Sequence, residues 1–344
     1  MARRPTIDDL ARTSGVSVAT VDRVLNGRAR VREETARKVY EAAQEIGYHA
    51  AGLINQRMQA DRPVVRVGFV LHKQAQAFYK AFHAAILSAA AGQDKVRIVP
   101  RIVFSPSQSP GDFAACMEDL ARDCDCIAAT AVSHNTITEK VVSLRARGIP
   151  CFALLNDFAQ GERQSYMGLN NIKVGRIAAS MVHLAAKEPG KLAVFVGGYR
   201  WHGHELRETG FRSYIREFAQ DFQIMDTLVN LETRQVTYEA TLDLLDRNRH
   251  LRGIYCAGGG MEGAIAAVRE LRAPGDVALV VNELTPESRA ALVDRYVTMV
   301  IATPLARLCA DVMGHMIDAK LHDALPIVGQ HFLQPDLFLP ESVS

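Results

Sequence analysis

The sequence predicts a mixed α/β protein, in which a small all-α head precedes a larger body built on parallel β-sheets. Three observations support this fold class. Short amphipathic helices follow one another near the N-terminus, and strand-like apolar runs alternate with helical segments from Val64 onward. Positive charge, in addition, is concentrated in the head.

The composition is that of a folded protein. At 344 residues, the chain has the length of two or three domains of about 100–200 residues each. Its 48% hydrophobic and 23% charged residues exclude a disordered or fibrous chain. No apolar run reaches the roughly 18–20 residues of a membrane span, and Asp8 and Asp9 stand where a secretory signal would be apolar. We therefore expect a cytoplasmic protein without membrane contact.

The cysteines and histidines do not form a recognisable metal site. The six cysteines are scattered and none pairs as Cys-x-x-Cys, so we expect reduced, mostly buried thiols. Cys124 and Cys126 lack nearby His or Cys partners, and the segment 201–205, with two histidines and a glutamate, lacks a further ligand. We expect no metal and no cofactor, and we interpret 201–205 as a ligand-facing loop.

The charge is divided unevenly along the chain. Lys and Arg outnumber Asp and Glu by 40 to 38, which gives a formal net charge of +2. Residues 1–62 contain 11 basic and 8 acidic side chains, or +3, which leaves 2 − 3 = −1 for the rest. A basic head on a near-neutral body indicates that the head meets a polyanion.

Two short helices are expected at the start of the head. Thr6 can cap a helix over residues 7–12, and Ser17 can cap a second helix over 18–25, with a break at Gly15 between them. Two short helices joined by a tight glycine turn form a helix-turn-helix, a DNA-binding arrangement.

A third helix, over residues 33–46, has one apolar stripe with which it covers the first two. Val18, Ala19 and Arg23 then remain on the outside, where they face a major groove, and Arg23 can pair bidentately with guanine. The alternative is a three-helix bundle with solvated arginines. Further side chains that fit contacts to phosphates or base edges are Thr6, Ser17, Thr20, Asn26, Arg28 and Arg30.

The head carries the runs TIDDLARTSGVSVATVDRVLNG at 6–27, VREETARKV at 31–39 and IGY at 46–48. Together these runs resemble the headpiece of lactose-repressor (LacI/GalR) type transcription regulators. The resemblance implies a sequence-specific DNA-binding regulator, in the family's commoner mode a repressor. It also implies a homodimer on a double-stranded, pseudo-palindromic operator, with a tetramer as the alternative.

Two features depart from the family pattern. Asp22 stands where the family usually has a serine, which puts a carboxylate near the path of a phosphate. In the linker, two alanines replace a Pro-Asn pair, and Arg57 stands where the family has a leucine that wedges into the minor groove. Leu53 or Met58 could form the wedge instead, or Arg57 could read a narrow minor groove electrostatically.

Repeated strand–helix units are expected after the linker. Such repeats favour parallel sheets covered on both faces, and two successive cycles favour two lobes. The expected strands lie at 64–71, 96–104, 126–131, 150–155, 166–169, 191–196, 253–257 and 277–282, and the helices at 78–91, 112–122, 136–147, 175–186, 206–218, 238–248 and 262–271.

The body carries AFY at 77–79, YMGLNN at 166–171, LRETGFR at 206–212, YCAGGG at 255–260 and NELTP at 282–286. These segments resemble the effector domain of the same family, which looks like a type I periplasmic sugar-binding protein. The implied domains are a headpiece at 1–49, a hinge linker at 50–63 and an effector-binding and dimerisation domain at 64–344. Lobe 1 would comprise about 64–160 and 304–322, and lobe 2 about 161–302 and 323–344.

In open α/β sheets, ligands bind beyond the carboxyl ends of the strands. Carboxylates, amides and an aromatic wall suit a small polar effector such as a sugar, polyol or sugar acid. As alternatives, the aromatic pair could be core, Asn156 and Asp157 an Asx turn, and Arg207 a surface ion pair. The expected effector contacts are Phe78, Tyr79, His134, Asn156, Asp157, Arg207, Asn282, Glu283 and Thr303, the last in place of the glutamine usual in sugar binders.

An NAD-dependent enzyme is the alternative function. GGGMEG at 258–263 satisfies the dinucleotide pattern G-x-G-x-x-G between an expected strand and helix. The strand is late in its sheet, however, and Glu283 lies 25 residues after Gly258 rather than roughly 20. We interpret the glycines as a cleft loop, and because no assignable nucleophile–base set is present, we expect no enzyme.

Overall fold

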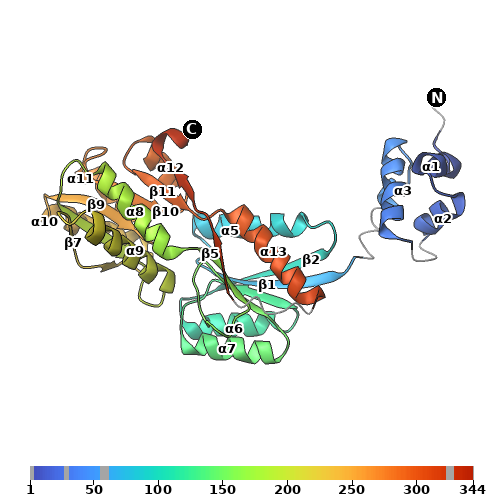
Figure 1. The fold of residues 1–344 in the computed structure, drawn as a ribbon, viewed down its shortest axis with the longest axis horizontal. Helices are drawn as coiled ribbons and strands as arrows, with labels where there is room; N and C mark the ends of the chain where they lie inside the picture. The colour runs from blue at the N-terminus through green and yellow to red at the C-terminus, as the bar shows by residue number, and fades with distance from the viewer. Residues whose placement is uncertain (1–3, 27–30, 55–61, 323–328, 344) are drawn as a thin grey trace. The chain divides into compact units, whose positions relative to one another are not determined.

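The computed structural model describes residues 4–26, 31–54, 62–322 and 329–343 (Figure 1). The chain divides into two compact units, one formed by residues 1–64 with 93–98 and the other by residues 65–92 with 99–344. No helix in the described ranges is long and apolar enough to cross a bilayer.

The smaller unit is the expected helical head. Its helices are α1 (Ile7–Ser14), α2 (Val18–Asn26) and α3 (Glu33–Glu45). Thr6 caps α1 in a capping box with Asp9, and the left-handed Gly15 ends the helix, as local sequence predicts. The three apolar stripes meet in one small core. The fully buried side chain of Ile54 packs in this core, which therefore extends into the segment that we expected to be linker.

The first lobe of the larger unit is a six-stranded sheet with helices on both faces. Its strands run in the order β12-β5-β4-β3-β1-β2, and α6 and α7 cover one face while α5 and α13 cover the other (Figure 1). The strands are β1 (Val64–His72), β2 (Arg97–Ser105), β3 (Cys126–Ala129), β4 (Cys151–Leu154), β5 (Ser165–Leu169) and β12 (Gln330–Leu333). The helices are α5 (Ala77–Ala91), α6 (Pro110–Leu120), α7 (Asn135–Ala146) and α13 (Leu305–Leu321).

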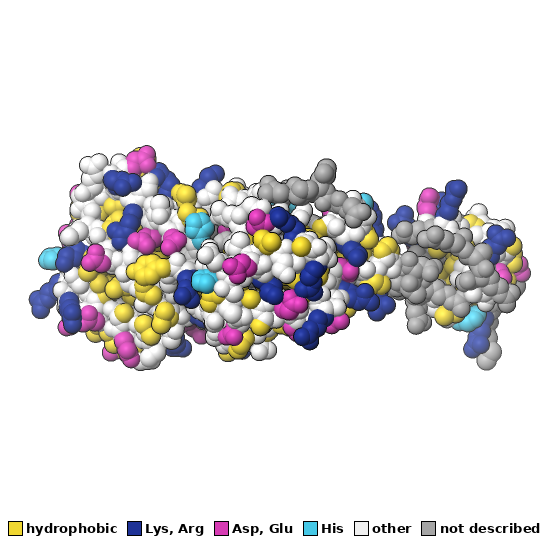
Figure 2. Space-filling view, turned by 90° about the horizontal axis from the view of Figure 1, so that it is seen from below, with side chains coloured by type: hydrophobic (Ala, Val, Ile, Leu, Met, Phe, Trp, Pro, Cys, Tyr) yellow, Lys and Arg dark blue, Asp and Glu magenta, His cyan; other side chains and the backbone are white. Residues whose placement is uncertain are grey.

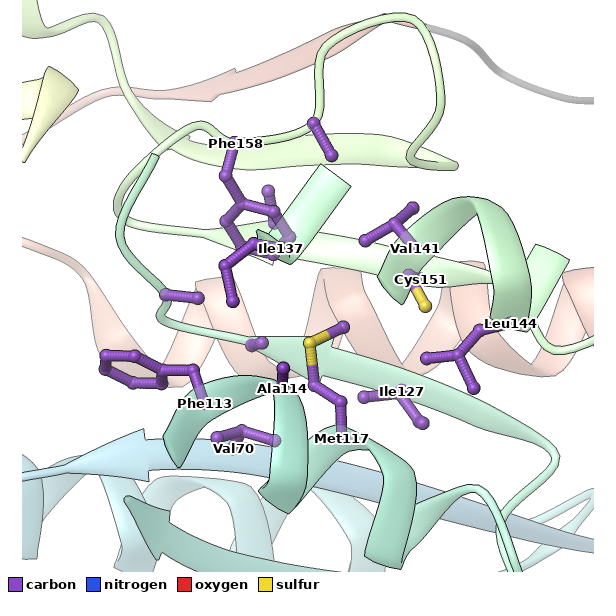
Figure 3. Close-up of a cluster of buried hydrophobic side chains, with 14 of the residues drawn as sticks. Val70, Phe113, Ala114, Met117, Ile127, Ile137, Val141, Leu144, Cys151 and Phe158 are labelled. Atoms are coloured by element: carbon purple, nitrogen blue, oxygen red, sulfur yellow. The ribbon is translucent and has the colours of Figure 1, made fainter. Parts of the chain in front are cut away.

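Figure 3 shows the core between this sheet and the α6–α7 layer. Met117 of α6 and Leu144 of α7 lie beside Ile127 of β3, Phe113 and Val141 belong to the same cluster, and all five are fully buried. Each such side chain contributes roughly 1.5–3 kcal/mol through burial. The apolar stripes of these helices therefore hold the first sheet in place, and the site residues follow the carboxyl ends of its strands.

The second lobe is a seven-stranded sheet with the main path β13-β11-β10-β9-β6-β7, and β8 pairs with β6. Its strands are β6 (Lys191–Val196), β7 (Gln223–Ile224), β8 (Leu228–Val229), β9 (Leu251–Cys256), β10 (Ala278–Asn282), β11 (Met299–Ala302) and the antiparallel β13 (Asp336–Phe338). Its helices are α8 (Asn171–Ala185), α9 (His202–Phe218), α10 (Arg234–Arg247), α11 (Met261–Leu271) and α12 (Pro286–Val293). On the visible face of the larger unit, basic and acidic side chains are interspersed (Figure 2).

A close approach of α8 to α9 fixes the position of the first turns of α9. A Cβ on Gly175 would lie 1.9 Å from the Arg207 carbonyl oxygen, and a Cβ on Gly210 would lie 2.1 Å from the Ile172 carbonyl oxygen. Only glycine fits either position. This contact holds the backbone that carries the Arg207 side chain.

Two strands lie in a different lobe from the one we expected. We expected residues 166–169 to open the second lobe and residues 323–344 to complete it. Instead β5 pairs with β4, and β12 pairs with β5, both within the first sheet. Hydrophobic periodicity identifies a strand but not the strand with which it pairs, so the lobe that we predicted for β5 and β12 is wrong. The elements α12, α13, β7, β8, β11, β12 and β13 have no counterpart among those predicted from the sequence.

Candidate functional site

The outer face of α2 is exposed near its start. Val18 is 41% exposed, and Ala19 and Arg23 are also exposed, as a base-reading surface requires. Ser17 caps α2, because its Oγ accepts a hydrogen bond from the Thr20 amide at 3.2 Å. The expected contacts Arg28, Arg30 and Arg57 lie outside the described residues, as does Met58.

The carboxylate of Asp22 has a partner within its own helix. Its Oδ1 accepts a hydrogen bond from Asn26 Nδ2 at 2.6 Å. This bond also occupies Asn26, which we expected to contact DNA. Thr6 is similarly occupied, because its side chain forms the capping box of α1. Both side chains therefore hold the helix ends in place, whatever else they contact.

A cavity lies between the two lobes of the larger unit, and its empty volume together with the adjoining open solvent is about 810 Å³. Its wall is formed largely by residues that follow strand ends, such as Thr130 after β3 and Gly258 after β9. Seven of the nine expected effector contacts line it: Phe78, Tyr79, Asn156, Arg207, Asn282, Glu283 and Thr303.

The aromatic wall lies at the start of α5. Phe78 and Tyr79 form a T-shaped ring pair with centroids 5.2 Å apart, and the Tyr79 hydroxyl lies 2.7 Å from His72 Nε2. Burial raises the pKa of Tyr79, so its hydroxyl remains protonated. Trp201 adds a third ring to the cavity, and its Nε1 donates to Gln108 Oε1 at 3.3 Å.

Asn156 ties the two lobes together. Its Nδ2 donates to the Ala131 carbonyl oxygen at 2.7 Å, and its Oδ1 accepts from the Gly203 amide at 2.9 Å. These bonds link the end of β4 to the first turn of α9. The Asx-turn alternative therefore does not describe its side chain.

Arg207 is buried rather than paired at the surface. Its Nε donates to Asn171 Oδ1 at 2.7 Å, and its Nη1 donates to the Ala257 carbonyl oxygen at 2.7 Å. These two bonds hold the guanidinium at the cavity wall. They leave a fixed positive charge there.

Glu283 and Asn282 form an acceptor-rich corner of the cavity. Glu283 has a left-handed backbone, with φ of 71°, and its carboxylate accepts from the Thr303 amide at 2.9 Å and hydroxyl at 2.7 Å. Burial raises the pKa of Glu283 despite those bonds and the nearby Arg207. Asn282 is 2% exposed, and its Oδ1 has no hydrogen-bond partner among the described residues.

A second charged group in the cavity centres on Glu232, which the sequence analysis missed. Its carboxylate lies 3.1 Å from Lys73 Nζ, 3.8 Å from His204 Nε2 and 3.9 Å from His72 Nε2. Lys73 also donates to the Glu232 carbonyl oxygen at 3.1 Å. Because Lys73 follows β1 and Glu232 follows β8, this group joins lobe 1 to lobe 2.

Burial determines the charge state of this cluster. It lowers the pKa of both His72 and His204 to about 4, although Glu232 opposes the shift. Burial would by itself raise the pKa of Glu232, but His204, Lys73 and His72 more than offset it and bring that pKa to about 2. At neutral pH the imidazoles are therefore uncharged, and Lys73 is the counterion of Glu232.

Two expected contacts lie elsewhere. His134 is the N-cap of α7, where its Nδ1 accepts from the Thr136 amide at 3.2 Å. Asp157 is buried in an ion pair with Arg163, whose Nε and Nη2 lie 2.5 and 2.8 Å from its oxygens. Both residues follow strand ends, but local partners hold their side chains outside the cavity wall.

Most of the cavity residues that the sequence analysis missed lie on helix starts and short loops. Trp201 and His204 belong to the segment that we interpreted as ligand-facing, and the three glycines from Gly258 line the cavity as the cleft-loop interpretation expected. A Cβ on Gly258 would lie 2.3 Å from His204 Cε1, so these glycines serve packing against protein side chains. The other missed residues are Gln76, Thr130, Leu155, Gly203, Glu232, Met261, Glu262 and Thr285.

Two family profiles match different parts of the chain. Residues 6–50 match the bacterial regulatory proteins of the lacI family, and residues 67–320 match the periplasmic binding protein domain. The two matches correspond to the helical head and to most of the two-lobed body.

Similar proteins include several regulators. HTH-type transcriptional regulator GalS of Salmonella typhimurium is 25% identical over 268 residues, which are 77% of this chain and 75% of GalS. GalR of Escherichia coli is 24% identical over 280 residues, 80% of this chain and 78% of GalR. Catabolite control protein A of Streptococcus mutans is 39% identical over 74 residues, 22% of each chain. None of these relatives supports the dinucleotide-enzyme alternative.

Solved structures share the fold of the body. A solute-binding protein from Burkholderia graminis, in complex with D-arabinose, has a TM-score of 0.75 at 16% identity and covers 82% of this chain and 97% of its own. A periplasmic solute-binding protein from Actinobacillus succinogenes, with bound D-allose, has a TM-score of 0.73 at 16% identity and covers 81% and 98%.

Proposed function

The chain belongs to the lacI family of bacterial regulatory proteins, with a periplasmic-binding-protein body, and from this premise we propose that a small polar ligand in the interlobe cavity controls its binding to operator DNA. The observation that carries the DNA half of the proposal is the exposed start of α2, with Val18, Ala19 and Arg23 on its outer face. In a helix-turn-helix, that position enters the major groove.

Arg23 reads a base edge in this proposal, because its guanidinium can donate two hydrogen bonds to guanine. Two heads of a homodimer bind a pseudo-palindromic operator, since a two-fold protein needs matched half-sites. Ser17 and Thr20 fit phosphate contacts, as do the arginines of the segments outside the described residues. The regulator acts in the cytoplasm, most simply as a repressor.

The effector proposed for the cavity is a sugar, polyol or sugar acid. Buried amides, carboxylates and the fixed Arg207 suit a ligand with several hydroxyl groups, and Phe78 and Tyr79 offer an apolar wall. Sugar complexes of solved structures with this fold support that class. We infer a binding function for the cavity.

Ligand binding would change DNA affinity by altering how the lobes close. Lys73, Asn156 and Glu232 already bond across the lobes, so a ligand that adds contacts to both favours one closure angle. A coupling of about 1–3 kcal/mol between the two sites is typical of such devices.

The test measures operator binding by the full-length protein. Fluorescence anisotropy reports its affinity for DNA duplexes taken from the neighbourhood of its own gene. We expect affinity to fall steeply as salt is raised, because phosphate contacts release counterions. We further expect at least one sugar, polyol or sugar acid to raise the melting temperature and change that affinity. Failure to bind any such duplex, with or without these ligands, would contradict the proposal.

A further inference from the structure

The cavity carries more negative charge than positive. Among the described residues that line it, Glu232, Glu262 and Glu283 are acidic and Arg207 is basic, so the formal charge of the wall is 1 − 3 = −2. Lys73, which is not part of the wall, neutralises Glu232 through its ion pair, so that the remaining formal charge of the cavity is −1. The histidine of the wall, His204, adds no charge at neutral pH because burial lowers its pKa to about 4.

Two of these carboxyls form no direct ion pair within the described ranges, although the guanidinium of Arg207 lies near enough to Glu283 to oppose the rise in pKa that burial causes. In the described part of the chain neither Glu262 nor Glu283 forms an ion pair, whereas Glu232 does with Lys73. Burial raises the pKa of both, which reflects the free-energy cost of placing their negative charge in the cavity wall. A ligand that brings a positive charge would remove that cost.

An independent observation points to a missing hydrogen-bond donor at the same place. Asn282 precedes Glu283, lines the cavity and is 2% exposed, yet its Oδ1 has no partner among the described residues. Its Nδ2 is fixed by the Ile301 carbonyl oxygen at 3.3 Å, which orients the amide. A buried acceptor left without a donor destabilises the folded protein, so a donor on the ligand would stabilise the complex.

We infer that the effector is a polyhydroxylated amine, whose ammonium group is bound by Glu283 and Asn282 Oδ1 and attracted by the negative charge of Glu262 on the same cavity wall. This inference rests on the proposed function and narrows its ligand class. An ammonium group has three donors and no acceptor, which matches the acceptors that the Glu283 carboxylate and Asn282 Oδ1 present. Phe78 and Trp201 supply aromatic faces that also favour a cation. A sugar acid has the opposite charge to the one that this corner requires.

The experiment compares ligands that differ only in charge at one carbon. The probes are 1-amino-1-deoxy-D-sorbitol, D-sorbitol and D-gluconate, with the corresponding galactitol and mannitol sets, and D-glucosamine and D-galactosamine beside their parent sugars. We expect at least one amine to bind at pH 7.5 at least tenfold tighter than its neutral parent by calorimetry, while the acid does not bind. A neutral or acidic member that binds as tightly as its amine, or no binding by any amine at 50 mM, overturns the inference.

Two variants locate the ammonium site. Glu283→Gln and Glu262→Gln should each weaken amine binding at least tenfold and change binding of the neutral parent less than twofold. Glu270→Gln is the matched control, because Glu270 is exposed on the same helix as Glu262. Unchanged amine selectivity in both cavity variants overturns the inference, and either variant suffices if the other does not fold.

The same samples distinguish this inference from the proposed function. Operator affinity is measured by anisotropy with each compound that binds. If a neutral sugar or a sugar acid binds and changes operator affinity, the proposed function stands and the amine inference is wrong. If an amine binds selectively but leaves operator affinity unchanged, the ligand class stands and the proposed control of DNA binding is wrong.

Discussion

Acidification should destabilise the larger unit through two buried histidines. His72 and His204 have pKa values near 4 in the folded protein, against 6.5 for an ordinary imidazole. Below pH 6.5 the unfolded chain therefore binds protons that the folded chain does not. Their contribution to stability is complete above pH 6.5 and is lost as the pH falls toward 4.

The size of the effect follows from the pKa difference. Between pH 7 and pH 4.5, each histidine should remove about 2–3 kcal/mol from the free energy of unfolding, or about 5 kcal/mol for the pair. Glu232 acts in the same direction at lower pH, because its pKa of about 2 lies below its ordinary value of 4.5. Its contribution is present above pH 4.5 and is lost as the pH falls toward 2.

The assay is urea unfolding of the full chain at a series of pH values. In the wild type, His204 Nδ1 accepts a hydrogen bond from the Gly197 amide at 3.1 Å. The His204→Asn variant keeps an acceptor for this amide, but its side chain cannot bind a proton in this pH range. We expect this variant to lose about 2 kcal/mol less than the wild type between pH 7 and pH 4.5. His250→Asn, at an exposed histidine, should leave the pH profile unchanged. A His204→Asn profile that parallels the wild type would refute the reasoning.

Three further predictions concern DNA reading and packing. Arg23→Ala should abolish the preference for operator over random duplex in a competition assay. The control Arg37→Ala, at an exposed arginine on α3, should retain this preference. If Arg23→Ala retains it as well, Arg23 does not read a base. Lys73→Met should lower the urea-derived free energy of unfolding by about 3 kcal/mol, because it leaves the buried Glu232 carboxylate without a cation, and a loss below about 1 kcal/mol would contradict this. Gly175→Ala should lower the melting temperature by several degrees, because its Cβ would collide with the Arg207 backbone, whereas Gly314→Ala on α13, with open space around its Cβ, should not; equal effects would argue against the close helix contact.

The sequence predicted the helices and strands where the physics is local. Thr6, Ser17 and Gly15 mark helix ends because a side-chain oxygen or a left-handed glycine satisfies the terminal backbone groups, whatever the rest of the chain does. Apolar periodicity similarly placed the main strands and helices of the body. Parallel-sheet logic then brought seven of nine expected residues to the cavity wall, because carboxyl strand ends meet at one edge.

Tertiary structure decided which strands are partners and where side chains point. β5 and β12 joined the first sheet because pairing depends on neighbours in space, which a strand's own pattern does not encode. Asp157 follows a strand end like Asn156, yet the Arg163 guanidinium binds its carboxylate outside the cavity wall. Glu232 reached the cavity from a loop with a left-handed backbone.

The sequence alone thus determined the two kinds of fold, the helix ends and the sheet edge at which the cavity lies. Only the folded chain decided the charge inside the cavity, since that charge depends on which carboxyls meet a cation when they are buried. Lys73 and Glu232 are 159 positions apart and pair across the lobes, whereas Glu262 and Glu283 are buried there without an ion pair among the described residues. Burial and Coulomb interactions act through space, and no local pattern in the chain reports them.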